Sequence, residues 1–118
     1  MKPKMFCYSR CGTCKKAKKW LTDNQIEITE LAIDKNPPSA DELTVWIDKS
    51  NLPLKRFFNT SGKIYKELNL KDTFDEHSRE ELIQLLSENG MLIKRPLLVT
   101  NQAILVGFKE DEWSEKLK

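Results

Sequence analysis

The stretch Cys11-Gly12-Thr13-Cys14-Lys15-Lys16 decides the fold, because it places two thiols between a short strand and a helix. Residues 4–8 have the apolar character of a strand, and Ala17 and Leu21 have helical spacing within residues 13–23. The free backbone amides at a helix start and the lysines that follow both favour a thiolate over a thiol. A second thiol one turn along can attack a mixed disulfide on the first. The stretch therefore predicts a redox-active dithiol.

Two other roles for the pair stay open from the residues alone. A structural zinc site needs four ligands, whereas the chain has three cysteines and one histidine, His77, far from the pair. Cys7 lies within the apolar strand, where a cysteine usually acts as a small buried hydrophobe. The second alternative is that Cys11 and Cys14 are an inert pair of core cysteines. His77 precedes a helix start and is expected to be exposed and structural. We expect neither a metal nor a cofactor.

Composition limits the class of protein. The chain of 118 residues is nearly balanced, with 20 basic and 18 acidic residues and a net charge of +2, which argues against direct nucleic-acid binding. It has no apolar run long enough to cross a membrane and no apolar stretch typical of a secretion signal. An odd number of cysteines also argues against a secreted disulfide scaffold. We therefore expect a cytoplasmic protein with no membrane association.

Four lysines follow the thiols within one helical stretch: Lys15, Lys16, Lys18 and Lys19. The ordinary interpretation is a solvated helix face. Because the cluster follows the dithiol directly, it also suits stabilisation of a thiolate or attraction of an anionic substrate, and the two interpretations are compatible.

Two strand-like segments flank this helix. Residues 25–33 carry Ile26, Ile28, Leu31 and Ile33 and predict a second strand after residues 4–8. A strand, a helix and a strand in succession predict parallel strands joined by a right-handed crossover. Residues 36–90 follow as a mostly helical block.

Capping boxes mark two helix starts inside this block. Ser39 with Glu42, and Ser78 with Glu81, have the spacing in which a serine and a glutamate satisfy each other's backbone amides. We expect a helix to begin after each serine.

The sequence also predicts where the helical block ends and which elements follow it. Asn89-Gly90 predicts a left-handed stop for the second of these helices. Residues 96–99 and 103–106 are apolar runs around a short polar turn and predict an antiparallel hairpin. A helix is predicted over residues 110–117.

The order strand–helix–strand, helical block, strand–strand–helix, with a dithiol at the first turn, is that of an α/β thioredoxin-like fold. It predicts a four-stranded mixed sheet in one domain over residues 1–118, with block 36–90 inserted between the second and third strands. Arg95-Pro96 lies where such folds carry a cis-proline.

On these features the chain resembles the arsenate reductase (ArsC)/Spx family, and most closely its Spx-like dithiol branch in Gram-positive bacteria. The resemblance extends over nearly the whole chain. The segments that carry it are residues 8–17, 36–39, 57–62, 65–70, 93–97 and 107–111.

The resemblance implies roles for individual residues. Cys11 is expected to be the nucleophile, and Arg95 to be one of three arginines that surround the oxyanion. The other two family arginines fall near Asn59 and Gly107 in this chain, so they are missing, unless Arg56 replaces one of them. An anion held by a single arginine is poorly oriented, because a fork of several donors fixes its position.

Cys14 stands where glutaredoxin-dependent arsenate reductases generally carry a serine. A cysteine there lets the protein resolve its own intermediate, as the Spx branch is able to do. Supporting roles in anion binding are expected for Gly12, Thr13, Lys15 and Pro96.

The function expected first is that of a thiol–disulfide oxidoreductase, reduced by a thioredoxin- or glutaredoxin-like protein or a low-molecular-weight thiol. The alternative is an Spx-like redox-sensing transcription regulator that binds the RNA polymerase α-subunit. The basic helix face and Trp20 beside it suit such a surface, but the more common role of a tryptophan among lysines is half-buried packing, and we favour that role for Trp20. A true arsenate reductase is the third candidate, weakened by the missing arginines.

Overall fold

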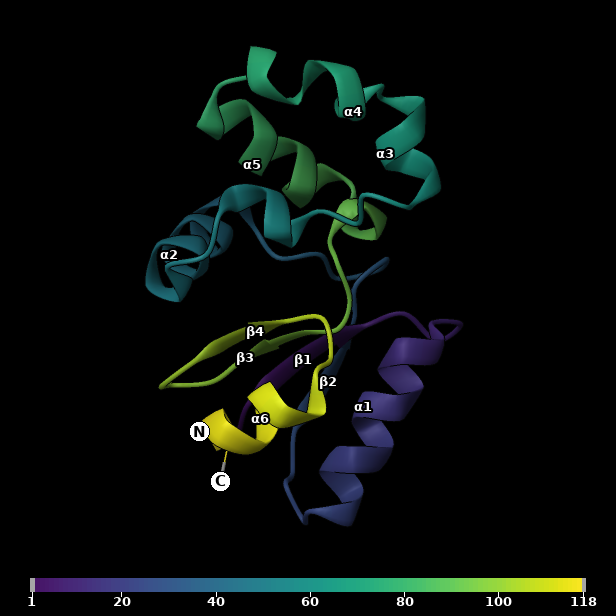
Figure 1. Ribbon diagram of the computed structural model, residues 1–118, viewed down its shortest axis with the longest axis vertical. Coiled ribbons are helices and arrows are strands. Elements are labelled where there is room, and N and C mark those ends of the chain that lie inside the picture. Colours follow the sequence, from purple (N-terminus) through teal and green to yellow (C-terminus); the bar gives the residue numbers. More distant parts are fainter. Residues whose placement is uncertain (1, 118) are drawn as a thin grey trace.

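The computed structural model describes residues 2–117, and a four-stranded mixed sheet lies at its centre (Figure 1). The strands are β1 (Lys4–Cys7), β2 (Thr29–Ala32), β3 (Leu97–Val99) and β4 (Ile104–Val106), in the spatial order β2-β1-β3-β4. β1 is parallel to β2 and antiparallel to β3, and β4 is antiparallel to β3. This topology confirms the expected α/β thioredoxin-like fold.

Helices cover both faces of the sheet. On one face lie α1 (Gly12–Asp23) and α6 (Glu110–Leu117), and on the other lies the helical block between β2 and β3 (Figure 1). That block, hereafter the insert, contains α2 (Ala40–Ser50), α3 (Lys63–Glu67), α4 (Leu70–Thr73) and α5 (Arg79–Glu88), with 3-10 turns at Leu54–Phe57, Phe74–Glu76 and Gly90–Leu92. The helical insert predicted between the second and third strands is confirmed. No helix within residues 2–117 has the length and apolar character to span a membrane.

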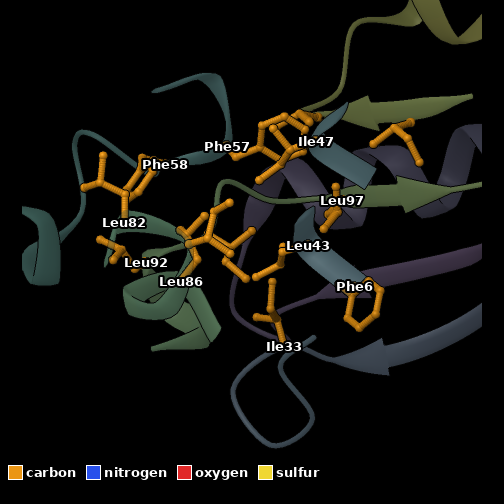
Figure 2. Packing of buried hydrophobic residues seen from close by; sticks show 14 of the residues in the cluster. Phe6, Ile33, Leu43, Ile47, Phe57, Phe58, Leu82, Leu86, Leu92 and Leu97 are labelled. Atoms are coloured by element: carbon orange, nitrogen blue, oxygen red, sulfur yellow. The ribbon is translucent and has the colours of Figure 1, made fainter. Parts of the chain in front are cut away.

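Strand alternation divides the buried residues into two layers. Phe6, Leu97 and Val106 point toward the insert and pack with residues of α2 and α5 such as Leu43 and Leu86 (Figure 2). Their neighbours along each strand belong to a second cluster, which packs against α1 and α6; it includes Met5, Cys7, Leu98 and Leu105. Since successive strand residues face opposite sides, a single sheet supports both layers. The cysteines lie in the second layer.

The second strand is shorter than predicted. It begins at Thr29 rather than at residue 25, because the end of α1 uses the preceding residues. Gln25 has a left-handed conformation with φ 59°, its amide donates to Thr22 and the amide of Ile26 donates to Leu21. This pair of hydrogen bonds is the Schellman arrangement that closes a helix.

The predicted left-handed stop at Asn89-Gly90 is wrong. Asn89 has φ −132°, and Gly90 starts a 3-10 turn without adopting positive φ. Glycine is needed there for another reason: a Cβ at Gly90 would lie 1.9 Å from the carbonyl oxygen of Ile33. The glycine signal was real, but it marks close backbone packing between the insert and the end of β2.

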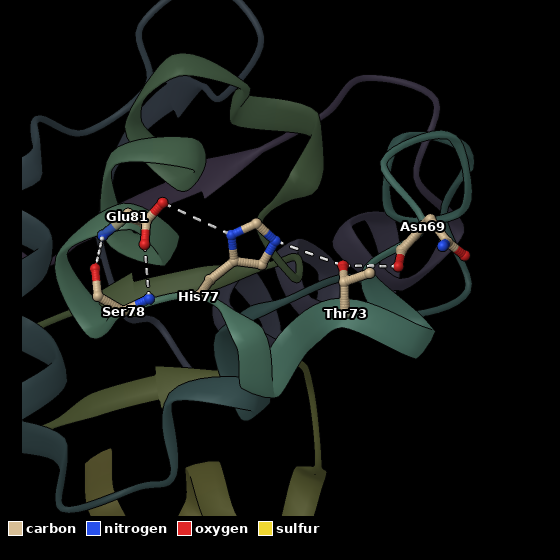
Figure 3. A network of polar contacts seen from close by, with 5 residues as sticks. All are labelled: Asn69, Thr73, His77, Ser78 and Glu81. Carbon is tan, nitrogen blue, oxygen red and sulfur yellow. Dashed lines mark hydrogen bonds and ion pairs between the residues drawn. The ribbon is translucent and has the colours of Figure 1, made fainter.

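Both predicted capping boxes are confirmed. The side chains of Ser39 and Ser78 accept the amides of Glu42 and Glu81, whose carboxylates accept the serine amides in return. His77, beside the second box, was expected to be exposed, but its side chain is only 31% exposed. Its ring lies between Thr73 Oγ1 and the Glu81 carboxylate in a local polar network (Figure 3).

Candidate functional site

Cys11 is the N-cap residue of α1, directly after the loop that leaves β1. Its backbone is extended, and its amide donates to the Tyr8 carbonyl at 3.0 Å. No side chain caps this helix start, and the first turn of α1 contains no acidic residue. The Cys11 side chain is half-buried. A nucleophile at this place combines partial access with the positive end of a helix.

Cys14 lies one turn along α1 and faces inward, with 1% of its surface exposed. Its sulfur accepts a hydrogen bond from the Tyr8 backbone amide and interacts with the thiols of both Cys11 and Cys7. Cys7, at the end of β1, is 2% exposed. All three cysteines are free thiols. Because Cys14 interacts with both of the others, it is the middle member of a row of three thiols.

The surroundings of Cys14 favour its thiolate. The hydrogen bond from the Cys7 thiol is the main cause that lowers the pKa of Cys14 to about 6, against the opposing effect of burial. The Tyr8 amide, the Cys11 thiol and the charge of Arg95 contribute in the same direction. The same hydrogen bond, together with burial, raises the pKa of Cys7. In this pair Cys14 is therefore the more acidic thiol and Cys7 the less acidic one.

A cavity of about 590 Å³ opens beside Cys11. Its cationic lining residues are Arg56, Lys94, Arg95 and Lys109, and none of the described residues that line it is acidic. Uncharged lining residues include Thr13, Asn59, Ser61 and Gly107. A cavity with this charge distribution favours anionic groups next to the Cys11 sulfur.

Arg95 is held in place on the wall of this cavity. Its Nη1 donates to the Met91 carbonyl at 3.0 Å, and its guanidinium lies 5.6 Å from the centre of the Tyr8 ring. Its Nε atom is buried and has no hydrogen-bond partner among residues 2–117. The Arg95–Pro96 peptide bond is cis, as expected for this position.

The structure brings together only some of the residues that sequence suggested. Thr13 lines the cavity with Cys11 and Arg95, whereas Gly12, Lys15 and Pro96 are not among its lining residues. Gly12 and Lys15 are exposed, and Pro96 is buried.

Asn59 and Gly107, the two positions where family arginines were expected, both line the cavity. Arg56 lines it as well, which supports its suggested replacement of one arginine. Lys94 extends over Gly107, with its Cε 3.0 Å from where a Cβ on that glycine would stand. Sequence reasoning missed Lys94 and Lys109 as site residues. Their signal was their place in the chain, directly before Arg95 and shortly after Gly107.

The lysine-rich face of α1 is largely an ordinary charged surface. Lys18 pairs with Glu30 at 3.1 Å and Lys19 pairs with Asp23 at 2.9 Å. Trp20 is 9% exposed and packs edge-on against Trp113, with ring centres 6.1 Å apart. Trp20 is therefore a core residue, in agreement with the packing role that is the more common one for a tryptophan among lysines.

Metal binding was one alternative for the cysteines. Within residues 2–117, no group of three or more His, Cys, Asp or Glu side chains is arranged to hold a metal ion.

Comparison with known proteins places this geometry in a family. The model of the ArsC family matches residues 6–116. The chain is 51% identical over 110 residues to the uncharacterized protein YusI of Bacillus subtilis, covering 93% of each. It is 32% identical over 108 residues to the global transcriptional regulator Spx of Streptococcus mutans, covering 92% of this chain and 77% of Spx. A crystal structure of an ArsC family related protein from Bacteroides fragilis matches with a TM-score of 0.94 and 50% identity, covering 98% of this chain and 97% of that one. The cysteine pair at the start of α1 therefore lies in a chain that belongs to the ArsC family.

Proposed function

We propose that this protein is a thiol–disulfide oxidoreductase in which Cys11 attacks the substrate and Cys14 resolves the intermediate. The observation that carries the proposal is the difference in exposure between the two sulfurs. Cys11 is half-buried on the wall of a cationic cavity, and Cys14 is buried behind it with its sulfur against the Cys11 thiol. The outer sulfur meets the substrate and the inner one is protected from it.

The reaction has two exchange steps. The Cys11 thiolate attacks one sulfur of a substrate disulfide, and the other substrate sulfur leaves as a thiolate. The Cys14 thiolate then attacks Cys11 Sγ, which releases the second substrate sulfur and forms the Cys11–Cys14 disulfide. The substrate gains two electrons and the protein loses them. A thioredoxin- or glutaredoxin-like protein, or a low-molecular-weight thiol, returns the electrons, which suits the reducing cytoplasm.

The cavity supports an anionic substrate. Arg95 is the proposed anchor, since its Nε lacks a partner and its charge stabilises the Cys14 thiolate. Arg56, Lys94 and Lys109 add positive charge around the same space. A disulfide that carries carboxylates near its sulfurs complements this lining.

Two disulfides of different charge test the proposal. Oxidised glutathione is anionic and bis(2-hydroxyethyl) disulfide is neutral, and each is supplied with thioredoxin, thioredoxin reductase and NADPH. We expect turnover of both, faster with the anionic one, and loss of that preference in Arg95→Gln. Cys11→Ser should be inactive, and Cys14→Ser should accumulate a mixed disulfide on Cys11. An active Cys11→Ser variant would exclude the mechanism.

A regulatory role is the second candidate, and the similarity to the global transcriptional regulator Spx of Streptococcus mutans supports it. Here the Cys11–Cys14 disulfide acts as a switch that changes the surface around the start of α1. The partner proposed is the RNA polymerase α-subunit. A pull-down with purified α-subunit, using the reduced and the oxidised protein, tests this role: a regulator binds in a redox-dependent way, whereas an enzyme only turns over.

Arsenate reduction is the third candidate. Asn59 and Gly107 give the cavity no fixed arginine at those positions, and lysines present point charges instead of forks. Arsenate turnover in the same thioredoxin-coupled assay, lost in Cys11→Ser, is the result that would support this activity.

A further inference from the structure

We infer that Cys7 is a third redox-active thiol, which exchanges with the Cys11–Cys14 disulfide to form a buried Cys7–Cys14 disulfide and release Cys11. The inference rests on the proposed function, because that function supplies the first disulfide. It adds a second oxidised form of the same protein, in which the outer cysteine is a free thiol again.

The position of Cys7 is set by the alternation of β1. Met5 and Cys7 point toward the face that α1 covers, whereas Phe6 points toward the insert. Cys14 is on the buried stripe of α1 that packs against this face, in the same cluster as Cys7. The two thiols already interact in the reduced protein, so Cys14 has a potential disulfide partner on either side.

The exchange balances without any further reagent. The Cys7 sulfur attacks Cys14 Sγ, the Cys7–Cys14 bond forms and the Cys11–Cys14 bond breaks. Cys11 leaves as a thiolate, which takes up the proton that Cys7 loses. The protein holds two oxidising equivalents before and after the step, so no electron enters or leaves.

The environment of Cys7 changes when the first disulfide forms. In the reduced protein the hydrogen bond to Cys14 is the main cause that raises the pKa of Cys7 and keeps it protonated. Once Cys14 is in a disulfide, it is no longer an anion, and that effect is lost. Burial and the charge of Glu30 still oppose the Cys7 thiolate, while Lys18 favours it. Cys7 is therefore a poor nucleophile while the protein is reduced and a better one after Cys11 and Cys14 have joined.

The two oxidised forms differ in access. A Cys11–Cys14 disulfide offers its outer sulfur to a reductant through the cavity. Cys7 and Cys14 are 2% and 1% exposed, so a disulfide between them is shielded from an external thiol. Its reduction requires Cys11 to attack Cys14 first and restore the outer bond. We expect the buried form to protect the oxidised state and delay its reduction.

Peptide mapping separates the two forms, because trypsin cleaves after Lys4, Arg10 and Lys15. Cys7 falls in peptide 5–10, and Cys11 and Cys14 fall together in peptide 11–15. The full-length protein is oxidised with diamide, the oxidant is removed, and samples are quenched in acid over time, alkylated with N-ethylmaleimide and digested. We expect peptides 5–10 and 11–15 to become linked, with the alkyl group on Cys11. A loop confined to peptide 11–15, with alkylated Cys7 at all times, overturns the inference and leaves the proposed function intact. If no disulfide forms at all, both fail.

Two single variants provide a matched comparison. Cys11→Ser retains Cys7 and Cys14 but lacks the outer sulfur at which oxidation begins, so its two buried thiols should stay free under diamide, as measured by intact mass. Cys14→Ser retains Cys7 and Cys11, which lack the middle sulfur, and should form no intramolecular disulfide. If Cys11→Ser forms a Cys7–Cys14 disulfide as fast as the wild type does, oxidation does not pass through Cys11 and the inference is wrong. Cys7→Ala gives a kinetic readout: thioredoxin should reduce the oxidised wild type in a fast and a slow phase, and the slow phase should be lost in the variant. A wild type that is reduced in a single phase identical to that of Cys7→Ala also contradicts it.

Discussion

The helices on the two sides of the sheet begin in different ways. In the insert, α2 and α5 each start with a complete capping box, in which Ser39 or Ser78 and the following glutamate satisfy the first backbone amides. Across the sheet, α1 starts at Cys11 with no side-chain cap and no acidic residue in its first turn. In α2 and α5 the positive end of the helix is satisfied by the helix's own serine and glutamate. The thiol helix leaves its positive end to the sulfurs and to whatever enters the cavity.

This difference indicates that one face of the sheet contributes mainly to stability and the other to thiol chemistry. Changes at the capping boxes and packing sites of the insert, away from its cavity-lining residues such as Arg56 and Asn59, should lower the free energy of unfolding and leave thiol chemistry in place. Changes at the start of α1 should alter the chemistry at little cost to stability, because the Cys11 side chain does not cap the helix. The variants that follow test this separation of stability from thiol chemistry.

The largest effect is expected at the thiol cluster. Ultraviolet absorbance should show a thiolate that forms near pH 6, and Cys14→Ser should remove this transition. Cys7→Ala should move it to higher pH, because the Cys7 hydrogen bond is the main cause of the lowered Cys14 pKa. The folded protein holds the Cys14 proton more weakly than the unfolded chain does, so this group adds stability as the pH rises from about 6 toward 9.0. That stability is lost as the pH falls back through 6.

The control for this titration is a stability variant in the insert. Ser78→Ala leaves the three thiols unchanged and should show the wild-type transition. A transition that persists in Cys14→Ser would assign the thiolate to another cysteine and remove the electrostatic argument for Cys14.

Gly90→Ala should be the most damaging single methyl in the insert. The new Cβ would lie 1.9 Å from the Ile33 carbonyl oxygen, so backbone must move. We expect the free energy of unfolding to fall by roughly 3 kcal/mol, as for other overpacked sites. Chemical denaturation measures it. Gly12→Ala is the matched control, because nothing lies within 4 Å of the added methyl at the start of α1. Equal losses in the two variants would show that the close packing at Gly90 is relieved without cost.

The capping difference itself is tested by three alanines. Ser39→Ala and Ser78→Ala should each lower stability by about 1 kcal/mol, because each removes an N-cap acceptor. Cys11→Ala removes no cap and should change stability by less than about 0.5 kcal/mol, while abolishing turnover. Ser87→Ala, on α5 but away from its start, controls for loss of a serine hydroxyl that donates to the Gln84 carbonyl. A loss at Cys11→Ala as large as at Ser78→Ala would mean that the thiol caps α1 after all.

Sequence predicted what depends on local rules. The capping boxes, the order of strands and the dithiol at the strand-to-helix turn all follow from residues close together in the chain. Gly90 shows the limit of this approach: its role depends on Ile33, far away in sequence, so a local rule assigned it the wrong reason. The start of β2 was placed too early because Gln25, an ordinary polar residue, adopts the left-handed conformation that glycine usually signals.

The reactive residues of the site were predictable from the sequence, but the residues that surround them were not. Cys11, Cys14 and Arg95 were identifiable from the motif and the resemblance. The charge of the cavity also depends on Lys94 and Lys109. Lysines are common on protein surfaces, and these two belong to no motif that would mark them as site residues. Cys7 was expected to be a buried hydrophobe, and it is buried; its contact with Cys14 depends on how β1 packs against α1, which alternation alone does not determine.

The smallest effect is expected at His77, at the edge of the insert. Its ring is 3.4 Å from Thr73 Oγ1 and 3.9 Å from the Glu81 carboxylate, which is a loose network around a partly exposed side chain. His77→Ala should change stability by less than about 0.5 kcal/mol, as most surface substitutions do. The pKa of Glu81 is lowered mainly by the Ser78 backbone amide and then by the Ser78 hydroxyl, with His77 a minor cause. The stability that this carboxylate adds is therefore present at neutral pH and lost in acid as the pH falls through its folded pKa, and this loss should persist in His77→Ala but not in Glu81→Gln. Denaturation series at neutral and acid pH measure the difference. If His77→Ala abolishes the acid dependence, the histidine rather than the capping box is what favours the Glu81 carboxylate, and the insert's second helix start is less self-sufficient than its serine and glutamate suggest.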